Sequence, residues 1–445
     1  MTLSRRTLLQ NGAGAALWTL AGRTVLTGST GQAAIANKAL AMAEDRRQEL
    51  VELLTRLVAI RSHSGETAEA AQAEVVRYLE QHGYRAEQSA DRPSRFADHA
   101  EFMPPNPPGD GPFVNVIGRP RDGLGRELAL FAHIDTEPAG DGWTTPPYQL
   151  VQKDGRLHGL GSADDKGGVA AMLVAAAALR DSGGGAPIVM SLHGKGGGSR
   201  GSLPVFARTP SLRAVLYVHP AETGRGMADI KHVVRGALDM TLAVRGWRSL
   251  PREIGSPDSA PYAEGGNALQ ACWGAIDRLR HRALAGCDVN IGRLEGGDRV
   301  GSVPDQAQAQ FRVLFDEPKT WRALVAGMER ELSAFLSELP SGRATFTATL
   351  STTGLRTNPG AVDWDGPACL SLRQAITNVT GSAPLSYTGH YAGDIRYPIR
   401  LLGAPAFGVG SRAGNFSGPN EWVDVDDLVR LVAVVIQTVS AWAKL

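Results

Sequence analysis

Helical patterns of apolar residues mark two stretches near the N-terminus and one in the middle of the chain. Residues 39–60 place five apolar side chains, from Leu50 to Val58, on one helical face. Residues 67–82 show the same period, and the alanine-rich residues 168–179 predict a buried helix. We therefore expect two amphipathic helices followed by a central buried one.

Short apolar runs bounded by polar or turn residues predict strands. Such runs lie at residues 127–133, 188–192 and 214–218. Continuous apolar runs of this length are typical of strands buried on both faces of a parallel sheet. Because these strands alternate with the predicted helices, the fold class is α/β, a sandwich with helices on both sides of a sheet.

The pattern changes near residue 230. Alternating strands and amphipathic helices then predict a compact α+β unit, with strands at residues 234–244, 306–315 and 345–350 and helices at residues 267–283 and 321–339. The large domain resumes by about residue 358 and ends with a helix over residues 425–443. The predicted large domain comprises residues 37–230 and 352–445, and residues 231–351 form the inserted smaller domain.

Composition agrees with two globular domains. The chain has 445 residues, of which 43% are hydrophobic and 20% charged, enough to build two cores. Its 46 basic and 45 acidic residues give a net charge of +1, so bulk charge predicts no nucleic-acid or membrane-surface partner. Cys272, Cys287 and Cys369 do not form a disulfide framework, although one pair could bridge in an oxidising compartment.

The N-terminus has the features of an export signal. Arg5 and Arg6 form a twin-arginine pattern before a weakly apolar stretch, and Ala34-Ile35-Ala36 suits signal peptidase. The alternative is a plain amphipathic leader. No later stretch offers the roughly 18 uncharged apolar residues of a membrane span. We expect residues 1–36 to be removed and the mature protein to be periplasmic or secreted.

Candidate chemistry lies at the end of one predicted strand. His133 and Asp135 form a His-x-Asp pair after the apolar run, and strand periodicity puts both side chains on one side. The carboxylate could then hold the imidazole tautomer for metal binding. With the segment Gly159-Leu-Gly-Ser-Ala-Asp164-Asp165-Lys166-Gly167, this pair resembles the ligand core of the M20 metallopeptidase and amidohydrolase family, including carboxypeptidase G2-like and acetylornithine deacetylase-like enzymes.

That resemblance implies a fold and a set of site positions. The fold is an α/β/α domain with an inserted ferredoxin-like lid that mediates homodimerisation. The Gly-Ser-x-Gly-Ser run that ends at Ser202 sets a register that puts Lys195 at the general-base position and Gly196 at a metal-ligand position. Ser417 stands where relatives carry the last metal-binding His, and His219 where they carry an acidic ligand. The family pattern is therefore altered at four functional positions.

Charge balance favours one metal ion over two. The resemblance implies four carboxylates around two divalent cations, and this chain retains only Asp164 of those four while Lys195 adds a positive charge. Two cations about 4 Å apart would be poorly compensated. We expect one divalent ion, of a type such as zinc, held by His133, Asp164 and His219, with Asp135 orienting His133. The alternative is a hydrogen-bonded site with no metal.

Two further residues have more than one interpretation. Lys195 could pair with Asp164 as an ammonium, or act as a neutral base or nucleophile, or its glycine-rich loop could bind an anion. Arg396, in the segment Gly393-Asp394-Ile395-Arg396 that resembles a Gly-x-Asp-x-Arg segment of the family, could contact a ligand carboxylate or form a structural salt bridge.

Two functions follow from these positions. One is an exported M20-type hydrolase that acts on a small amide or peptide-like molecule with one metal or with Lys195. The other is a catalytically deficient homologue that binds a ligand or a partner protein.

Overall fold

The computed structural model describes residues 34–445 apart from residues 64, 106–107, 123–126, 184, 196–197, 248–265, 299, 301, 340–344 and 390. The export pattern at Arg5 and Arg6 lies outside the described residues, and so does Gly196. In the part of the chain that is described, no helix is both long and apolar enough to cross a membrane.

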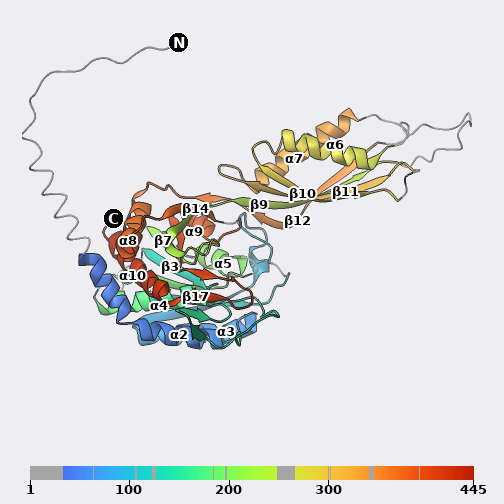
Figure 1. Ribbon diagram of the computed structural model, residues 1–445. Coiled ribbons are helices and arrows are strands. Elements are labelled where there is room, and N and C mark those ends of the chain that lie inside the picture. The colour runs from blue at the N-terminus through green and yellow to red at the C-terminus, as the bar shows by residue number, and fades with distance from the viewer. Residues whose placement is uncertain are drawn as a thin grey trace, which may run out of the picture.

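A mixed sheet of nine strands forms the centre of the large domain (Figure 1). In spatial order the strands are β1 (Tyr84–Asp91), β2 (Phe113–Pro120), β6 (Ile188–Leu192), β3 (Leu128–His133), β7 (Ala214–Val218), β15 (Ala406–Val409), β8 (Asp229–Val234) and β13 (Gly360–Ala361), with β14 (Leu385–Gly389) also paired to β8. The strands β6, β3, β7 and β15 are mutually parallel. The outer pairs β1–β2 and β2–β6 are antiparallel, whereas the strands predicted from apolar runs, β3, β6 and β7, are parallel as expected.

Helices cover both faces of this sheet, which confirms the predicted α/β/α sandwich. One core cluster packs the sheet against α2 (Arg47–Ala59), α3 (Gly65–Gln81), α4 (Lys166–Asp181), α8 (Pro367–Thr380) and α10 (Val425–Trp442). The other packs it against α5 (Ser202–Phe206) and α9 (Arg396–Leu402). The alanine-rich α4 is buried along most of its length, as expected, because small side chains allow close approach to the sheet and to α10.

The first predicted helix is divided in two. Residues 34–44 are helical, residues 45–46 form a turn, and α2 follows. The five apolar residues predicted on one face of α2 are its five buried residues. The turn falls in the charged run from Glu44 to Arg47, which contributes no side chain to the hydrophobic core, so core packing does not require the helix to continue straight there.

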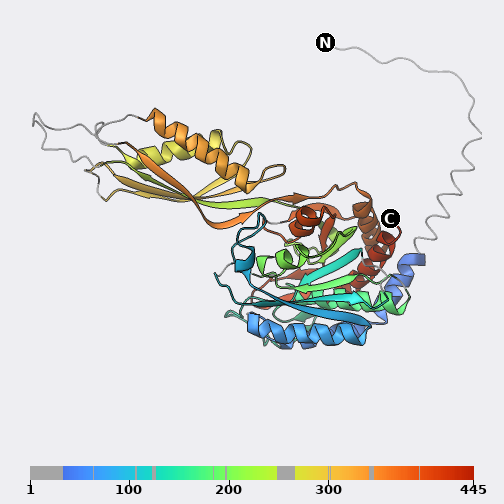
Figure 2. The same cartoon turned by 180° about the vertical axis from the view of Figure 1, so that it is seen from behind.

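The smaller domain has the predicted ferredoxin-like arrangement and projects away from the large sheet (Figures 1 and 2). Its antiparallel sheet has the order β10 (Asp288–Gly296), β11 (Gln306–Phe315), β9 (Gly236–Arg245) and β12 (Thr347–Thr357). The helices α6 (Ala268–His281) and α7 (Trp321–Glu338) pack on one face around their own core cluster. The chain order β-α-β-β-α-β with this strand order is the split βαβ topology.

The boundary of the insertion lies a few residues from its predicted position. The sequence pattern suggests one strand over residues 234–244, but the structure separates β8 from β9 at Arg235. The strand β8 pairs with β13, β14 and β15 of the large sheet, so residues 231–234 belong to that sheet. Most residues of both strands are buried, and therefore the apolar pattern alone does not show which sheet a residue joins.

A third sheet of four short strands brings two distant segments together. It contains β16 (Ala413–Gly414), β17 (Trp422–Asp424), β5 (Arg156–His158) and β4 (Val151–Lys153), in that order. Pairing of β17 with β5 places the residues before Trp422 beside the loop that follows His158. The C-terminal Ser417 segment thus reaches the loop that carries Asp164.

Candidate active site

The predicted site residues meet at one edge of the large sheet. His133 ends β3, His219 follows β7, and Lys195 follows β6. Parallel strands present their carboxyl ends at the same edge, which is where α/β proteins place their ligands. Asp164 reaches this edge from the loop before α4. The structure thus brings together four of the residues that the sequence singled out: His133, Asp164, Lys195 and His219.

Asp164 is the central acceptor of the site. Its Oδ1 lies 2.9 Å from His133 Nε2 and 3.2 Å from His219 Nε2. Its Oδ2 accepts hydrogen bonds from Lys195 Nζ and, at 3.0 Å, from Ser417 Oγ. Burial alone would raise the pKa of Asp164, but the positive charge of Lys195 and the two imidazoles hold it well below its usual value. The two carboxylate oxygens therefore serve different partners.

Lys195 takes the ion-pair role among its predicted alternatives. Its Nζ donates to Asp164 Oδ2 and, at 2.7 Å, to Ser417 Oγ. Burial opposes the charge on Lys195, but the Asp164 carboxylate outweighs burial and raises the pKa of the amine. A neutral amine acting as a base or nucleophile is disfavoured by this arrangement. A Cβ at the neighbouring Gly194 would lie 2.8 Å from the ring of His133, so the loop approaches the imidazole closely.

The backbone of the glycine-rich loop is held by a carboxylate of the chain itself, that of Asp135. Backbone N–H groups of Gly194 and Lys195 donate to its two carboxylate oxygens at 2.8 and 3.0 Å. His133 Nδ1 lies 3.1 Å from the backbone carbonyl oxygen of Asp135. It lies 3.6 Å from the nearer carboxylate oxygen of Asp135, which is too far for a hydrogen bond. Asp135 therefore orients His133 mainly through its carbonyl and fixes the Lys195 loop with its carboxylate.

The two imidazoles differ in their environment. Burial opposes protonation of His133, but the adjacent Asp135 and Asp164 raise its pKa to about 10. Burial, reinforced by the charge of Lys231, lowers the pKa of His219 to about 4. Lys231 Nζ lies 2.8 Å from His219 Nδ1 and donates to Glu222 Oε1 at 3.2 Å. Lys231 is a site residue that the sequence reasoning missed, because it lies inside a strand with no motif to mark it.

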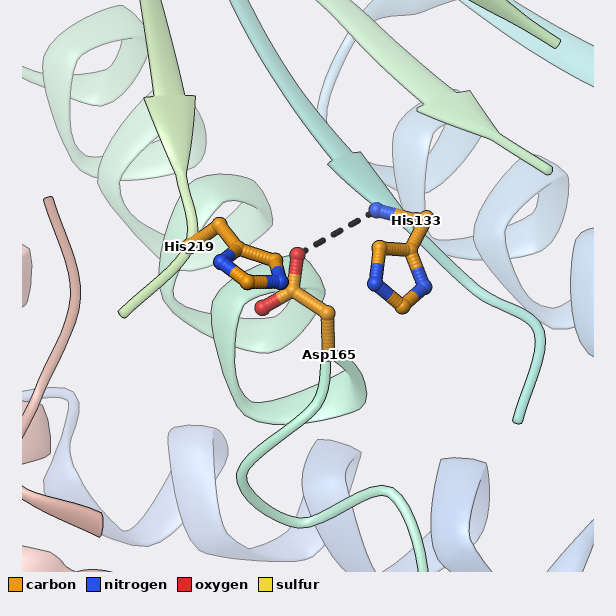
Figure 3. A group of neighbouring side chains, drawn as sticks. All are labelled: His133, Asp165 and His219. Atoms are coloured by element: carbon orange, nitrogen blue, oxygen red, sulfur yellow. Dashed lines mark hydrogen bonds between the residues drawn. The ribbon is translucent and has the colours of Figure 1, made fainter. Parts of the chain in front are cut away.

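Asp165 is a second residue that the sequence reasoning missed. With His133 and His219 it forms a group whose ligand atoms lie within 4.8 Å of one another, and Figure 3 shows its carboxylate between the two imidazoles. Its Oδ2 accepts from the backbone N–H of His133 at 3.3 Å, and among the described residues its buried Oδ1 has no hydrogen-bond partner. Burial raises its pKa well above the usual value. Adjacency to Asp164 was the only signal in the sequence.

The donor types present fit one divalent cation. Two imidazoles and a carboxylate are ligands that zinc accepts, and His219 is uncharged at neutral pH. Asp135 and Asp164 favour the protonated ring of His133. A cation that binds this ring would have to displace a proton, because metal-binding imidazoles are neutral. The Oδ1 side of Asp164 faces both imidazoles, whereas its Oδ2 side is already neutralised by Lys195. The Oδ1 side of Asp164 therefore faces donors of the types that a divalent cation accepts.

A cleft of about 970 Å³ opens onto these residues. Its lining includes His133, Asp164, Lys195 and His219 from the large domain, and Asp239, Arg312 and Leu355 from the smaller one. Arg312 donates to both oxygens of Asp239, at 2.6 and 2.8 Å, so its guanidinium is already paired. This volume would admit a small molecule or a short peptide.

Arg396 lies away from the cleft surface. Its side chain is 0% exposed and donates to the carbonyl of Ala392 and to the hydroxyl of Tyr397. A buried guanidinium packed on the Tyr397 ring supports the structural alternative over a ligand contact, although the partners are a carbonyl and a hydroxyl rather than an acid. The sequence could not distinguish these, because a motif gives spacing but not the direction of a side chain.

Comparisons with known proteins agree with this fold. The sequence model of peptidase family M20/M25/M40 matches residues 129–441. The succinyl-diaminopimelate desuccinylase of Gluconobacter oxydans (strain 621H) is 26% identical over 347 residues, which cover 74% of this chain and 86% of that protein. The enzyme of the same name from Rhizorhabdus wittichii is 28% identical over 314 residues, covering 67% and 78%. The crystal structure of aminopeptidase PepT from Bacillus cereus has a similar fold, with a TM-score of 0.68, 18% identity and coverage of 89% and 99%.

Proposed function

Because this chain belongs to the M20/M25/M40 peptidase family, we propose that its cleft binds a small amide or peptide-like molecule beside at most one divalent cation. His133, Asp164 and His219 would hold the cation. A cation bound there supplies Lewis-acid polarisation of a ligand carbonyl. Lys195 occupies the other side of Asp164, and any hydrolysis at this site is slow compared with that of an enzyme that has a carboxylate base.

The observation that carries this proposal is that the two oxygens of the Asp164 carboxylate have different partners. One oxygen lies between the two imidazole Nε2 atoms, and the other accepts from the Lys195 ammonium. A carboxylate that bridges two cations needs both oxygens free. With one oxygen paired to an ammonium, a second divalent ion would meet an uncompensated positive charge at short range.

A catalytically deficient binding protein is the second candidate function. It is favoured by the same Lys195 ion pair, because an ammonium donates protons and cannot accept one from water. Hydrolysis measurements separate the two candidates, and ligand binding is common to both.

Binding of an amide-like ligand can be measured directly. Calorimetric titration with dipeptides and N-acyl amino acids should detect at least one ligand, and Lys195→Met should weaken its binding about tenfold or more, because a charged hydrogen bond contributes about 1.5–3 kcal/mol. Lys153→Met removes an exposed lysine of β4 and serves as the control, with affinity unchanged. Absence of binding across the panel, or equal affinity in all three proteins, would contradict the proposal.

Export is the proposed fate of the chain. Replacing Arg5 and Arg6 by lysine should leave an uncleaved precursor in the cytoplasm, since the paired arginines are the recognition element of the signal. Cleavage after Ala36 would retain Ala39 and Ala43, both packed in the large core. Fractionation followed by N-terminal sequencing tests this, and a variant that is still exported and trimmed near Ala36 would refute it.

Self-association is the proposed role of the smaller domain. Among the described residues, the outer edge of β12 pairs with no other strand, and an open strand edge is a template for pairing with a second copy. Light scattering should therefore show a dimer at micromolar concentration. Deleting residues 236–357 should leave a folded monomer, because Val234 and Gly360 are already paired across the cut. A full-length protein that is monomeric would count against this assignment.

A further inference from the structure

Glu421 is a buried carboxylate directed at the loop that carries Asp164. It is 0% exposed, and its Oε2 accepts from Gly161 N at 2.8 Å. Its Oε1 accepts from Ala163 N at 2.9 Å and from Asp164 N at 2.8 Å. Three backbone N–H groups of one short loop thus converge on a single carboxylate, as they do around a bound anion.

Residues 417–421 form two further hydrogen bonds with the loop that carries Asp164. The backbone carbonyl of Glu421 accepts from Gly159 N at 3.0 Å. Four residues earlier, Ser417 Oγ donates to Asp164 Oδ2 at 3.0 Å. Residues 417–421 therefore hold both the backbone and the side chain of Asp164.

The direction of the Asp164 side chain depends on where its backbone is held. Pairing of β17 with β5 fixes the frame on which Glu421 sits, and Glu421 in turn fixes the N–H of Asp164. From that position Oδ1 reaches the Nε2 atoms of His133 and His219. Within the described residues, the Glu421 side chain has hydrogen bonds only to this loop.

We propose that Glu421 is a positioning residue that directs the Asp164 carboxylate at the two imidazoles. It acts through the loop backbone, and it supports the cation site of the proposed function without contacting the ligand or the cation. Removing the Glu421 carboxylate leaves the backbone N–H groups of Gly161, Ala163 and Asp164 without their acceptor. The loop backbone then shifts so that these N–H groups bind other acceptors, and the Asp164 carboxylate loses its contacts with the two imidazole rings.

The test is a crystal structure of Glu421→Gln. A glutamine side chain has one acceptor oxygen and one N–H₂ donor, so it cannot accept from all three N–H groups. The expected result is that Asp164 Oδ1 moves beyond about 3.5 Å from both Nε2 atoms, the limit of a hydrogen bond. Both distances retained within about 0.3 Å, less than the roughly 0.5 Å width of the hydrogen-bond range, would overturn the proposal.

Asp427→Asn is the matched control. Asp427 is also a buried carboxylate, and it accepts from the backbone N–H of Arg412 at 2.6 Å, away from the imidazoles. This variant should lose stability in the same way but keep the Asp164 geometry. If Glu421→Gln does not fold, Glu421→Asp serves instead, because the shorter carboxylate retains its charge but cannot span all three N–H groups.

Zinc titration provides a readout that a general loss of stability would not change. Glu421→Gln should weaken Zn²⁺ binding by about 10- to 100-fold, as loss of an outer partner of a metal ligand typically does. The control should bind zinc as the unmodified protein does. If the unmodified protein binds no zinc, the proposed function is limited to ligand binding without a cation, while the crystallographic result still decides the role of Glu421.

Discussion

Ordinary dipeptidase and N-acyl amino acid deacylase turnover should be about two to four orders of magnitude below the rate of an enzyme with a carboxylate base, since that is the usual contribution of a general base. The reason lies in the protonation of Lys195. Its amine donates to Asp164 and Ser417, and the Asp164 carboxylate keeps it charged. A charged ammonium cannot take a proton from an attacking water.

Hydrolysis of dipeptides and N-acyl amino acids with added zinc or cobalt checks this expectation. Lys195→Glu restores a carboxylate at the same position and should raise the rate above that of the unmodified protein. Lys153→Met is again the control for a lost lysine charge. Turnover near ordinary enzyme rates in the unmodified protein would show that another group takes the proton, and Lys195→Met would then test whether the amine itself is that group.

At most one divalent ion per chain is expected when the protein is purified without chelator and analysed for bound metal. His133→Ala or His219→Ala should abolish binding, because each removes an imidazole that faces Asp164 Oδ1. Ser417→Ala should leave the ion in place, because Ser417 contacts the other carboxylate oxygen. Two ions in the unmodified protein would contradict the charge argument, whereas none would favour the Lys195 and Asp164 ion pair as the resting state.

Restoring the residues that the family resemblance implies should raise the stoichiometry towards two ions. The variant combines Lys195→Glu, Gly196→Glu and Ser417→His, which removes one ammonium and adds two carboxylates and an imidazole. Ser417 already has a left-handed backbone with a φ of 56°, and the new histidine would keep that conformation. Lys195→Glu alone is the informative control, since it removes the ammonium without supplying the other ligands.

The sequence by itself determined the architecture and most of the site residues. Apolar runs predicted β6 and β7 at their observed bounds, because a strand buried on both faces must be apolar throughout. Helical periodicity placed the buried face of α2 for a similar reason. His133, Asp164, Lys195 and His219 were found through motif spacing. His133, Lys195 and His219 meet because the carboxyl ends of neighbouring parallel strands share one edge, and the loop before α4 brings Asp164 to that edge.

Only the tertiary structure decided how those residues are paired. Lys195 had three interpretations in the sequence, and the contact with Asp164 selects one, because that contact joins segments 31 residues apart. The sequence assigned no role to Lys231, Asp165 or Glu421, since their hydrogen-bond partners are brought to them only by folding. Residues 231–234 joined the large sheet for the same reason: an apolar pattern predicts a strand, whereas its neighbouring strand is decided by the folded chain.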